Sequence, residues 1–161
     1  MQDYYDRVEK ITEFIKSKSG LSPKTAVVLG SGLGGFASEI EEQTVIPFTE
    51  IPDFPVSTVK GHAGRLIFGK LFGKDILAMQ GRFHRYEGYD MKDVTLYVRV
   101  MFMLGIENLV LTNAAGGINT DFVPGDLMLI TDSGTIIRTP VKDIPVYSRS
   151  AAGVIVMRMA G

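Results

Sequence analysis

The sequence predicts a soluble α/β protein with a mixed order of helices and strands. Two observations lead to this expectation. Short apolar runs alternate with amphipathic stretches, and several of these runs end directly in glycine-rich or polar loops. Because ligands in α/β sheets bind at the carboxyl ends of strands, these loops are the first candidates for a functional site.

The first part of the chain is expected to contain a helix followed by a buried strand. Residues 2–18 repeat apolar side chains at spacings of three and four, and Gly20 is placed to end the helix. Residues 25–29 form a mostly apolar run, which is typical of a strand buried on both faces. Residues 36–42 suit a short helix, and residues 44–60, which prolines interrupt, are expected to be extended with loops.

The middle of the chain is predicted to form a helix and several strands. Helical periodicity runs through residues 91–104, and Gly105 is placed to end that helix. A turn at Gly73-Lys74 suits a hairpin. The expected strands are 65–72, 75–80, 108–111 and 126–131.

The composition excludes several classes of protein. Of the 161 residues, 45% are hydrophobic, and 17 basic residues against 18 acidic ones leave a net charge of −1. This hydrophobic content is not that of a disordered protein, and the charge balance is not that of a nucleic-acid binder. The absence of cysteine excludes disulfides and thiolate metal sites. No apolar run suits a membrane helix and the N-terminus is polar, so a cytoplasmic protein without a membrane partner is expected.

The last part of the chain differs from the rest. Short β-like pieces alternate there with glycine and proline, at 135–138, 144–147 and 154–157. Four basic residues against one acidic residue give residues 133–161 a charge of +3, which leaves −4 for residues 1–132. We therefore divide the chain into residues 1–132 and a β-rich tail of residues 133–161.

The glycine-rich loop after the first strand has three interpretations. It reads Gly-Ser-Gly-Leu-Gly-Gly over residues 30–35. Its backbone N–H groups and the Ser31 hydroxyl suit an anion. Its spacing also matches G-x-G-x-x-G, with Glu50 about 20 residues further on, as in dinucleotide sites, although only residues 36–42 are available for the crossover helix. The third interpretation is a tight turn without a ligand.

Residues 81–88, Gly-Arg-Phe-His-Arg-Tyr-Glu-Gly, form a second candidate loop. In an extended chain, Arg82, His84 and Tyr86 would project to one side. A guanidinium binds phosphate through two parallel hydrogen bonds, and an imidazole adds a charge-assisted one. A tyrosine beside them suits packing on a sugar. The alternative is a solvated polar loop.

Two further loops are candidate binding loops, and each also has a non-functional interpretation. Residues 60–64 place His62 among glycine and alanine, although an ordinary loop histidine is the favoured interpretation. Residues 112–117, Thr-Asn-Ala-Ala-Gly-Gly, follow a strand, and their small side chains let the backbone approach a flat ligand. A plain strand-to-helix turn is the alternative for this loop.

In this order, the four loops closely resemble those of trimeric-type purine nucleoside phosphorylases. The resemblance covers about residues 1–132 and includes Pro-Asp-Phe-Pro at 52–55 and Val-Pro-Gly-Asp-Leu at 123–127. It implies a nucleoside phosphorylase-like three-layer αβα fold with a mixed central sheet, here truncated. It also implies phosphorolysis of inosine or guanosine to the free base and ribose 1-phosphate, a reaction that depends on positioning and electrostatics. Inorganic phosphate is the implied co-substrate, with no metal or organic cofactor.

The resemblance also implies roles for individual residues and a homotrimeric assembly. The implied phosphate ligands are Ser31, Arg82, His84 and the backbone N–H of Ala114. His62 would lie near the phosphate, and Tyr86 would face the ribose. The loop of residues 112–117 would contribute Asn113, Ala115 and Gly116, and the last two would line the purine pocket.

After Asp132 the resemblance changes. The family's second half, which carries the purine-recognising Glu and Asn, is missing. Residues 133–161 instead resemble one blade segment of the C-terminal β-propeller of the DNA gyrase A subunit. A lone propeller blade buries little, so useful DNA binding is not expected. We predict that this chain alone is inactive or weakly active, and that exposed strands make it aggregate or depend on a partner. The alternatives are a non-catalytic phosphate-binding or oligomerisation module and weak DNA binding through the basic tail.

Overall fold

The computed structural model divides the chain into two compact units, residues 1–114 and 115–161. It describes residues 2–30, 32–56, 63–112, 121, 123, 126–130, 136–140 and 142. This division by compactness differs from the division at residue 132, which is predicted from composition, charge and resemblance.

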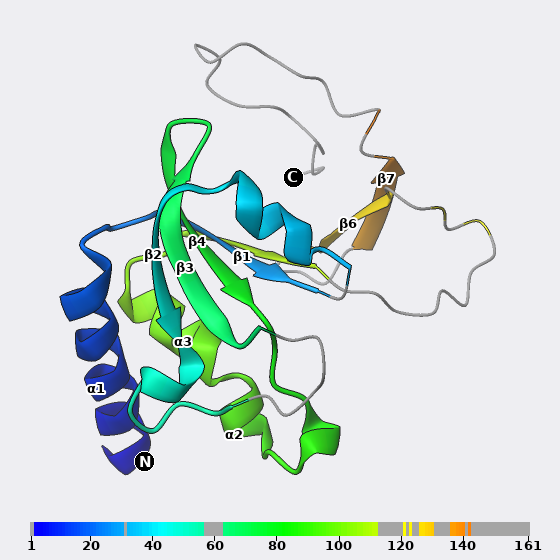
Figure 1. Cartoon of the computed structure of the whole chain (residues 1–161). Helices are drawn as coiled ribbons and strands as arrows, with labels where there is room; N and C mark the ends of the chain where they lie inside the picture. The colour runs from blue at the N-terminus through cyan, green and yellow to red at the C-terminus, as the bar shows by residue number, and fades with distance from the viewer. Residues whose placement is uncertain are drawn as a thin grey trace, which may run out of the picture. The chain divides into compact units, whose positions relative to one another are not determined.

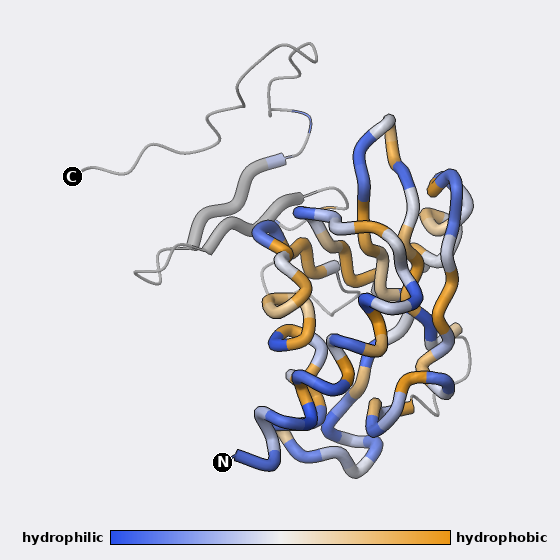
Figure 2. Tube along the Cα trace, turned by 90° about the vertical axis from the view of Figure 1, so that its left-hand side faces the viewer, coloured by the Kyte–Doolittle hydropathy of each residue, from blue (hydrophilic) through white to orange (hydrophobic). Residues whose placement is uncertain are grey.

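Helix α1 (Gln2–Ser19) opens the first unit, one residue longer than predicted. Val8, Ile11 and Ile15 follow the predicted spacing and are buried. Figure 2 shows the resulting alternation of hydrophilic and hydrophobic segments along this helix. Gly20, with a φ of 63°, ends the helix in the left-handed conformation that glycine adopts most easily.

A five-stranded mixed sheet forms the centre of the first unit, with the order β2-β3-β4-β1-β5 (Figure 1). Strand β1 is parallel to β4 and β5, whereas β3 is antiparallel to its neighbours β2 and β4. The strands are β1 (Thr25–Leu29), β2 (Glu41–Pro47), β3 (Arg65–Leu71), β4 (Lys74–Gln80) and β5 (Asn108–Leu111). The predicted mixed sheet is confirmed.

The β3–β4 hairpin is also confirmed, with its turn shifted by one residue. Phe72 and Gly73 form the connection instead of Gly73 and Lys74, with φ values of 51° and 76°. Two consecutive positive φ values suit the twist of a two-residue hairpin turn. Lys74 pairs with Leu71 and therefore belongs to β4.

Apolar side chains cover both faces of the sheet. On one face, alternate strand residues such as Val28 and Leu77 pack with α1 and with α3 (Leu96–Met103). On the other face, Val27 and Ile67 pack with Ala37 of the 3-10 helix η1 (Gly34–Glu39). The three predicted layers are therefore present in the first unit, with η1 as a short third layer.

Two helical predictions need correction. The helix expected over residues 36–42 is the 3-10 helix η1, and β2 begins directly after it, earlier than the extended stretch expected from residue 44. The helix expected over residues 91–104 is divided at Thr95 into α2 (Met91–Val94) and α3. Thr95 has a φ of −101° and a ψ of 3°, and its hydroxyl donates to the Met91 carbonyl at 2.7 Å, which competes with a continuous helix.

In the second unit, β6 (Asp126–Ile130) and β7 (Ile136–Pro140) form an antiparallel pair. Strand β6 confirms the strand expected at 126–131, and β7 overlaps the piece expected at 135–138. The pieces expected at 144–147 and 154–157 lie outside the described residues.

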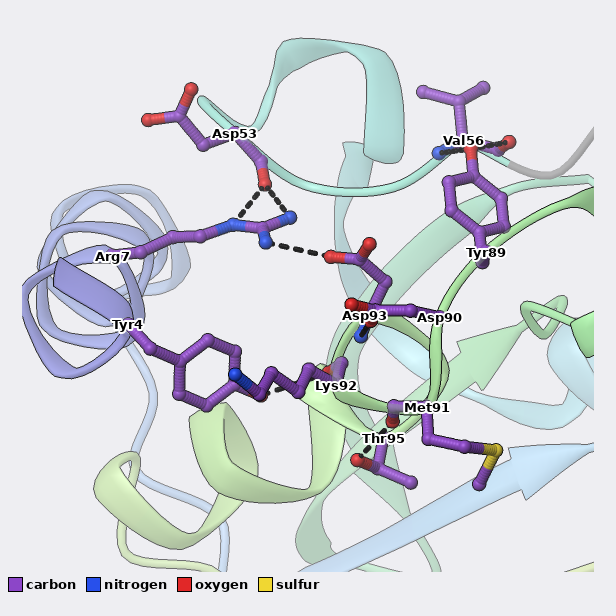
Figure 3. A network of polar contacts seen from close by, with 10 residues as sticks. All are labelled: Tyr4, Arg7, Asp53, Val56, Tyr89, Asp90, Met91, Lys92, Asp93 and Thr95. Carbon is purple, nitrogen blue, oxygen red and sulfur yellow. Dashed lines mark hydrogen bonds and ion pairs between the residues drawn. The ribbon is translucent and has the colours of Figure 1, made fainter. Parts of the chain in front are cut away.

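Arg7 connects α1 to the segments that flank the candidate loops (Figure 3). Its Nε and Nη2 donate to the Asp53 carbonyl at 2.9 and 2.7 Å, and its Nη1 donates to the Asp93 carboxylate at 2.7 Å. The Tyr89 hydroxyl donates to the Val56 carbonyl at 2.8 Å and accepts from the Val56 N–H at 3.1 Å. These bonds hold residues 53–56 against the segment that follows β4.

Asp90 caps α2 and makes the stability depend on pH. Its carboxylate accepts the Asp93 backbone N–H at 2.9 Å, and this bond lowers the pKa of Asp90 below its ordinary 3.8. A carboxyl whose pKa is lowered by folding stabilises the folded state above its unfolded pKa, and this contribution is lost as the pH falls through the folded pKa. We expect Asp90→Ala to lower the melting temperature at pH 7, and the difference from the parent to narrow below pH 3.8.

Circular dichroism melts at several pH values measure this effect. Asp90→Asn is the control, because asparagine caps helices but does not titrate. Its melting temperature should stay near that of the parent at pH 7. An Asp90→Ala deficit of the same size at neutral and acidic pH would contradict the prediction.

Candidate functional site

The directions of the strands bring the candidate loops to one edge of the sheet. The parallel strands β1, β4 and β5 end there at Leu29, Gln80 and Leu111. The antiparallel strand β3 begins at the same edge, because its first residue, Arg65, pairs with Gln80. The residues that follow β1, β4 and β5 (Gly30, Gly81 and Thr112) and the residue before β3 (Gly64) therefore lie at this edge, as expected for a ligand site.

The structure describes three of the nine predicted site residues, Arg82, His84 and Tyr86. The other six, Ser31, His62, Asn113, Ala114, Ala115 and Gly116, lie outside the described residues, and their roles stay predictions.

Arg82 follows β4 and bonds to the end of β5. Its Nη1 donates to the Thr112 carbonyl at 2.9 Å. The Thr112 hydroxyl in turn donates to the Val28 carbonyl and accepts the Gly30 N–H, each at 2.8 Å. These bonds connect the ends of β1, β4 and β5, so the half-buried guanidinium of Arg82 is held in a fixed position relative to the glycine-rich loop.

A buried carboxylate holds His84. The Glu87 side chain is 3% exposed, and its Oε2 accepts the His84 backbone N–H at 2.9 Å and lies 3.0 Å from His84 Nδ1. A bond from Nδ1–H to the Glu87 carboxylate sets the tautomer and the orientation of the ring. Glu87 was not among the residues selected from the sequence, although a Glu three residues after a capping position is a recognisable signal.

The expectation of an extended chain through Tyr86 needs correction. The backbone is extended at His84, with a φ of −126° and a ψ of 147°, but residues 85–87 form the 3-10 helix η3 (Arg85–Glu87). The Glu87 bonds to His84 and the left-handed Gly88, with a φ of 93°, stabilise this turn. Tyr86 still lies beside His84, because the two rings stack with centroids 4.7 Å apart and an interplanar angle of 19°. Tyr86 is 74% exposed.

A hydrogen bond from Gln80 connects the glycine-rich loop to the end of β4. Its Nε2 donates to the Gly34 carbonyl at 3.1 Å, and its Oε1 accepts from Arg65 Nε at 2.7 Å. A Cβ at Gly34 would lie 3.3 Å from Gln80 Nε2, so a side chain there would require this amide to shift by a few tenths of an ångström. No sequence pattern distinguished Arg65 and Gln80, since they meet only through the pairing of β3 with β4.

The dinucleotide interpretation of the glycine-rich loop does not agree with the topology. Strand β2 pairs with β3 at the edge of the sheet and does not lie beside β1. In the described chain between β1 and β2, the helical segment is η1, a six-residue 3-10 helix. A dinucleotide-binding unit requires a full crossover helix between adjacent parallel strands.

The described residues contain no group of three or more His, Cys, Asp or Glu side chains arranged to hold a metal ion. None of the helices in the same part of the chain is both long and apolar enough to cross a membrane.

The mixed sheet and the loops at its strand ends define an α/β protein with a candidate anion-binding edge. A family model described as the Phosphorylase superfamily matches residues 24–156. The chain therefore belongs to the Phosphorylase superfamily.

Its relatives agree with the resemblance found in the sequence. Purine nucleoside phosphorylase 1 of Bacillus subtilis is 58% identical over 127 residues, or 79% of this chain and 47% of that protein. Purine nucleoside phosphorylase of Mus musculus is 50% identical over 128 residues, or 80% of this chain and 44% of that protein. The chain thus spans about half the length of the curated relatives it matches.

A solved structure shows the same fold. Isoform 2 of purine nucleoside phosphorylase from Schistosoma mansoni, in complex with cytosine and ribose-1-phosphate, is 45% identical with a TM-score of 0.69. The match covers 77% of this chain and 44% of the other. The similarity at this level confirms the nucleoside phosphorylase-like fold and the partial coverage expected from the sequence.

Proposed function

We propose that this chain forms the phosphate-binding half of a purine nucleoside phosphorylase. The observation that carries the proposal is the placement of Arg82 and of His84, held by Glu87, at the sheet edge where the glycine-rich loop begins. A guanidinium and an imidazole N–H supply two side-chain donors for phosphate. The names of the relatives support a purine nucleoside as the second substrate.

In the proposed reaction, a phosphate oxygen attacks the anomeric carbon of inosine or guanosine while the bond from that carbon to the base nitrogen breaks. The bonding electrons leave with the purine, which takes up the proton that hydrogenphosphate releases on forming the ester, and the products are the free base and ribose 1-phosphate. The anionic phosphate stabilises the positive charge that develops on the sugar. The protein's part is to hold phosphate in line with the breaking bond, which Arg82 and His84 would do through fixed donors.

Further roles are proposed from the family resemblance. The additional phosphate ligands would be Ser31, His62 and the Ala114 N–H. Tyr86 would pack on the ribose, and the purine would lie against Ala115 and Gly116, in the loop that contains Asn113. No metal or organic cofactor takes part in this proposal.

We propose that residues 1–161 alone are inactive or weakly active, because they span about half the length of the curated relatives. Val110 and Leu111 on the edge strand β5 are 47% and 57% exposed, in keeping with a sheet that needs further chain or a partner. Hypoxanthine release from inosine and phosphate by purified residues 1–161 measures this. Turnover at ordinary phosphorylase rates would overturn it.

Inorganic phosphate should raise the melting temperature of the chain, and Arg82→Met should abolish this effect. A ligand that binds only the folded state at 100 times its dissociation constant stabilises it by about 2.7 kcal/mol. Thermal melts in phosphate and in chloride of equal ionic strength measure the shift. Arg99→Met is the matched control, because Arg99 lies outside the candidate site, with its Cζ 5.6 Å from the centroid of the Tyr4 ring. The proposal fails when phosphate acts no differently from chloride, or when Arg82→Met keeps the shift.

Two other functions remain as alternatives. A non-catalytic phosphate-binding or oligomerisation module would show the rise in melting temperature with phosphate but no turnover of inosine, whatever its oligomeric state. Weak DNA binding through the basic residues 133–161 would appear as salt-dependent retention on DNA that is lost when this segment is deleted. Retention that survives the deletion, or none at low salt, would dismiss it.

The origin of the tail, the assembly and the location are also proposals. We propose that residues 133–161 derive from a gyrase-like propeller blade joined near Asp132, although the family match extends to residue 156. The nucleotide sequence around the Asp132 codon in an independent clone tests this junction. A homotrimer is proposed from the family resemblance, and sedimentation of the chain tests it. A cytoplasmic location is proposed from the composition of the sequence.

A further inference from the structure

Thr112 bonds to two other segments at the strand edge through three polar atoms. Its backbone N–H donates to the Val28 carbonyl at 3.1 Å. Its hydroxyl donates to the same carbonyl and accepts the Gly30 N–H, each at 2.8 Å. Its carbonyl accepts from Arg82 Nη1 at 2.9 Å. One residue is therefore bonded to the end of β1, to the first residue of the glycine-rich loop, and to Arg82.

This pattern departs from an ordinary parallel ladder. In such a ladder, the bond that follows Thr112 N–H to the Val28 carbonyl would run from the Gly30 N–H to the Thr112 carbonyl. Here the Thr112 hydroxyl accepts the Gly30 N–H instead. The side chain thus replaces the carbonyl in the ladder, and the carbonyl is available to accept the bond from Arg82.

We propose that Thr112 is a positioning residue for phosphate. Its hydroxyl sets the direction in which the chain leaves β1 at Gly30, and its carbonyl orients the Arg82 guanidinium. The inference rests on the phosphate binding proposed above. Thr112 acts through Arg82 and the glycine-rich loop and does not itself contact the anion.

The role requires a hydroxyl and not only the volume of the side chain. Valine matches threonine in shape but neither donates nor accepts. In Thr112→Val, the Gly30 N–H must compete with Arg82 for one carbonyl or lose its partner. Serine keeps the hydroxyl and should keep both bonds.

The test measures the dissociation constant of inorganic phosphate for the full chain by calorimetry. We expect Thr112→Val to weaken binding by about tenfold or more, comparable to one charge-assisted hydrogen bond, and Thr112→Ser to stay within about threefold of the parent. Amide exchange at Gly30 is the second readout, with faster exchange in Thr112→Val and parent-like exchange in Thr112→Ser. If the valine variant does not fold, Thr112→Cys takes its place, because a thiol is only a weak acceptor.

A double-mutant cycle with Arg82→Lys, which keeps the charge, separates positioning from general destabilisation. Because both residues act on the same contact, the two losses of phosphate affinity should be less than additive. Full additivity would overturn the inference. The inference would also be overturned if Thr112→Val bound phosphate like the parent, or if Thr112→Ser bound it as weakly as Thr112→Val is expected to. These results would leave phosphate binding by the parent intact. Absence of phosphate binding by the parent would overturn both this inference and the proposed function.

Discussion

Gly69→Ala is expected to lower the free energy of unfolding by about 3 kcal/mol, at the upper end of the usual cost of overpacking. An added Cβ would overlap the Glu41 carbonyl oxygen and lie 2.6 Å from Ile40 Cγ2. The register of β2 against β3 shifts between Glu41 and Thr44, and this irregularity brings the backbone of β2 against Gly69. Because a backbone atom is the obstacle, the strand pair itself must move to relieve the overlap.

Urea denaturation followed by circular dichroism measures this cost. Gly35→Ala is the matched control, since nothing lies within 4 Å of a Cβ at that position. The control should change the free energy of unfolding by less than about 0.5 kcal/mol. A cost for Gly69→Ala no larger than that of Gly35→Ala would show that β2 does not approach Gly69 so closely.

Phe83→Ala is expected to lower the free energy of unfolding by about 3–5 kcal/mol, the usual range for removing a buried aromatic ring. Phe83 is 3% exposed, and its ring centroid lies 5.3 Å from those of both Phe48 and Phe54. Tyr89 adds a fourth ring, with its centroid 6.1 Å from that of Phe83. The substitution therefore leaves a cavity at the centre of an aromatic cluster.

The same substitution should also weaken phosphate binding. Phe83 lies between Arg82 and His84 in the chain, so its buried ring fixes the backbone that carries both side chains. Denaturation and phosphate-dependent melts of the same variant measure the two effects. Phe102→Ala is the control, because Phe102 is 79% exposed and should change neither quantity. A variant that loses stability but keeps the full phosphate shift would separate the aromatic cluster from the site.

Local residue patterns were sufficient to predict most of the described elements. The extent of α1 follows from its apolar spacing and from Gly20, and β1 follows from a short apolar run. The β3–β4 hairpin was predictable for the same reason, since alternation and a turn glycine lie within a few residues. The predictions at η1 and Thr95 were wrong, because pairing of β2 with β3 and a side-chain bond to the backbone outweighed local helical preference.

The candidate loops were recognisable from residue types and their order along the chain. Arg82 and His84 led to the prediction of an anion site, because the guanidinium and imidazole groups carry that chemistry themselves. The residues that position them were not recognisable in this way. Thr112 is ordinary in sequence, and its bonds to Gly30 and Arg82 exist only because β1 lies between β4 and β5.

The type of each helix or strand therefore depended on residues close in sequence, and the chemistry of each side chain on its residue type. The strand order and the residues that position the site depended on tertiary pairing. The connection between residues 30, 82 and 112 illustrates the difference. Hydrogen bonds require approach within about 3 Å, and only the packed sheet brings these distant positions of the chain so close together.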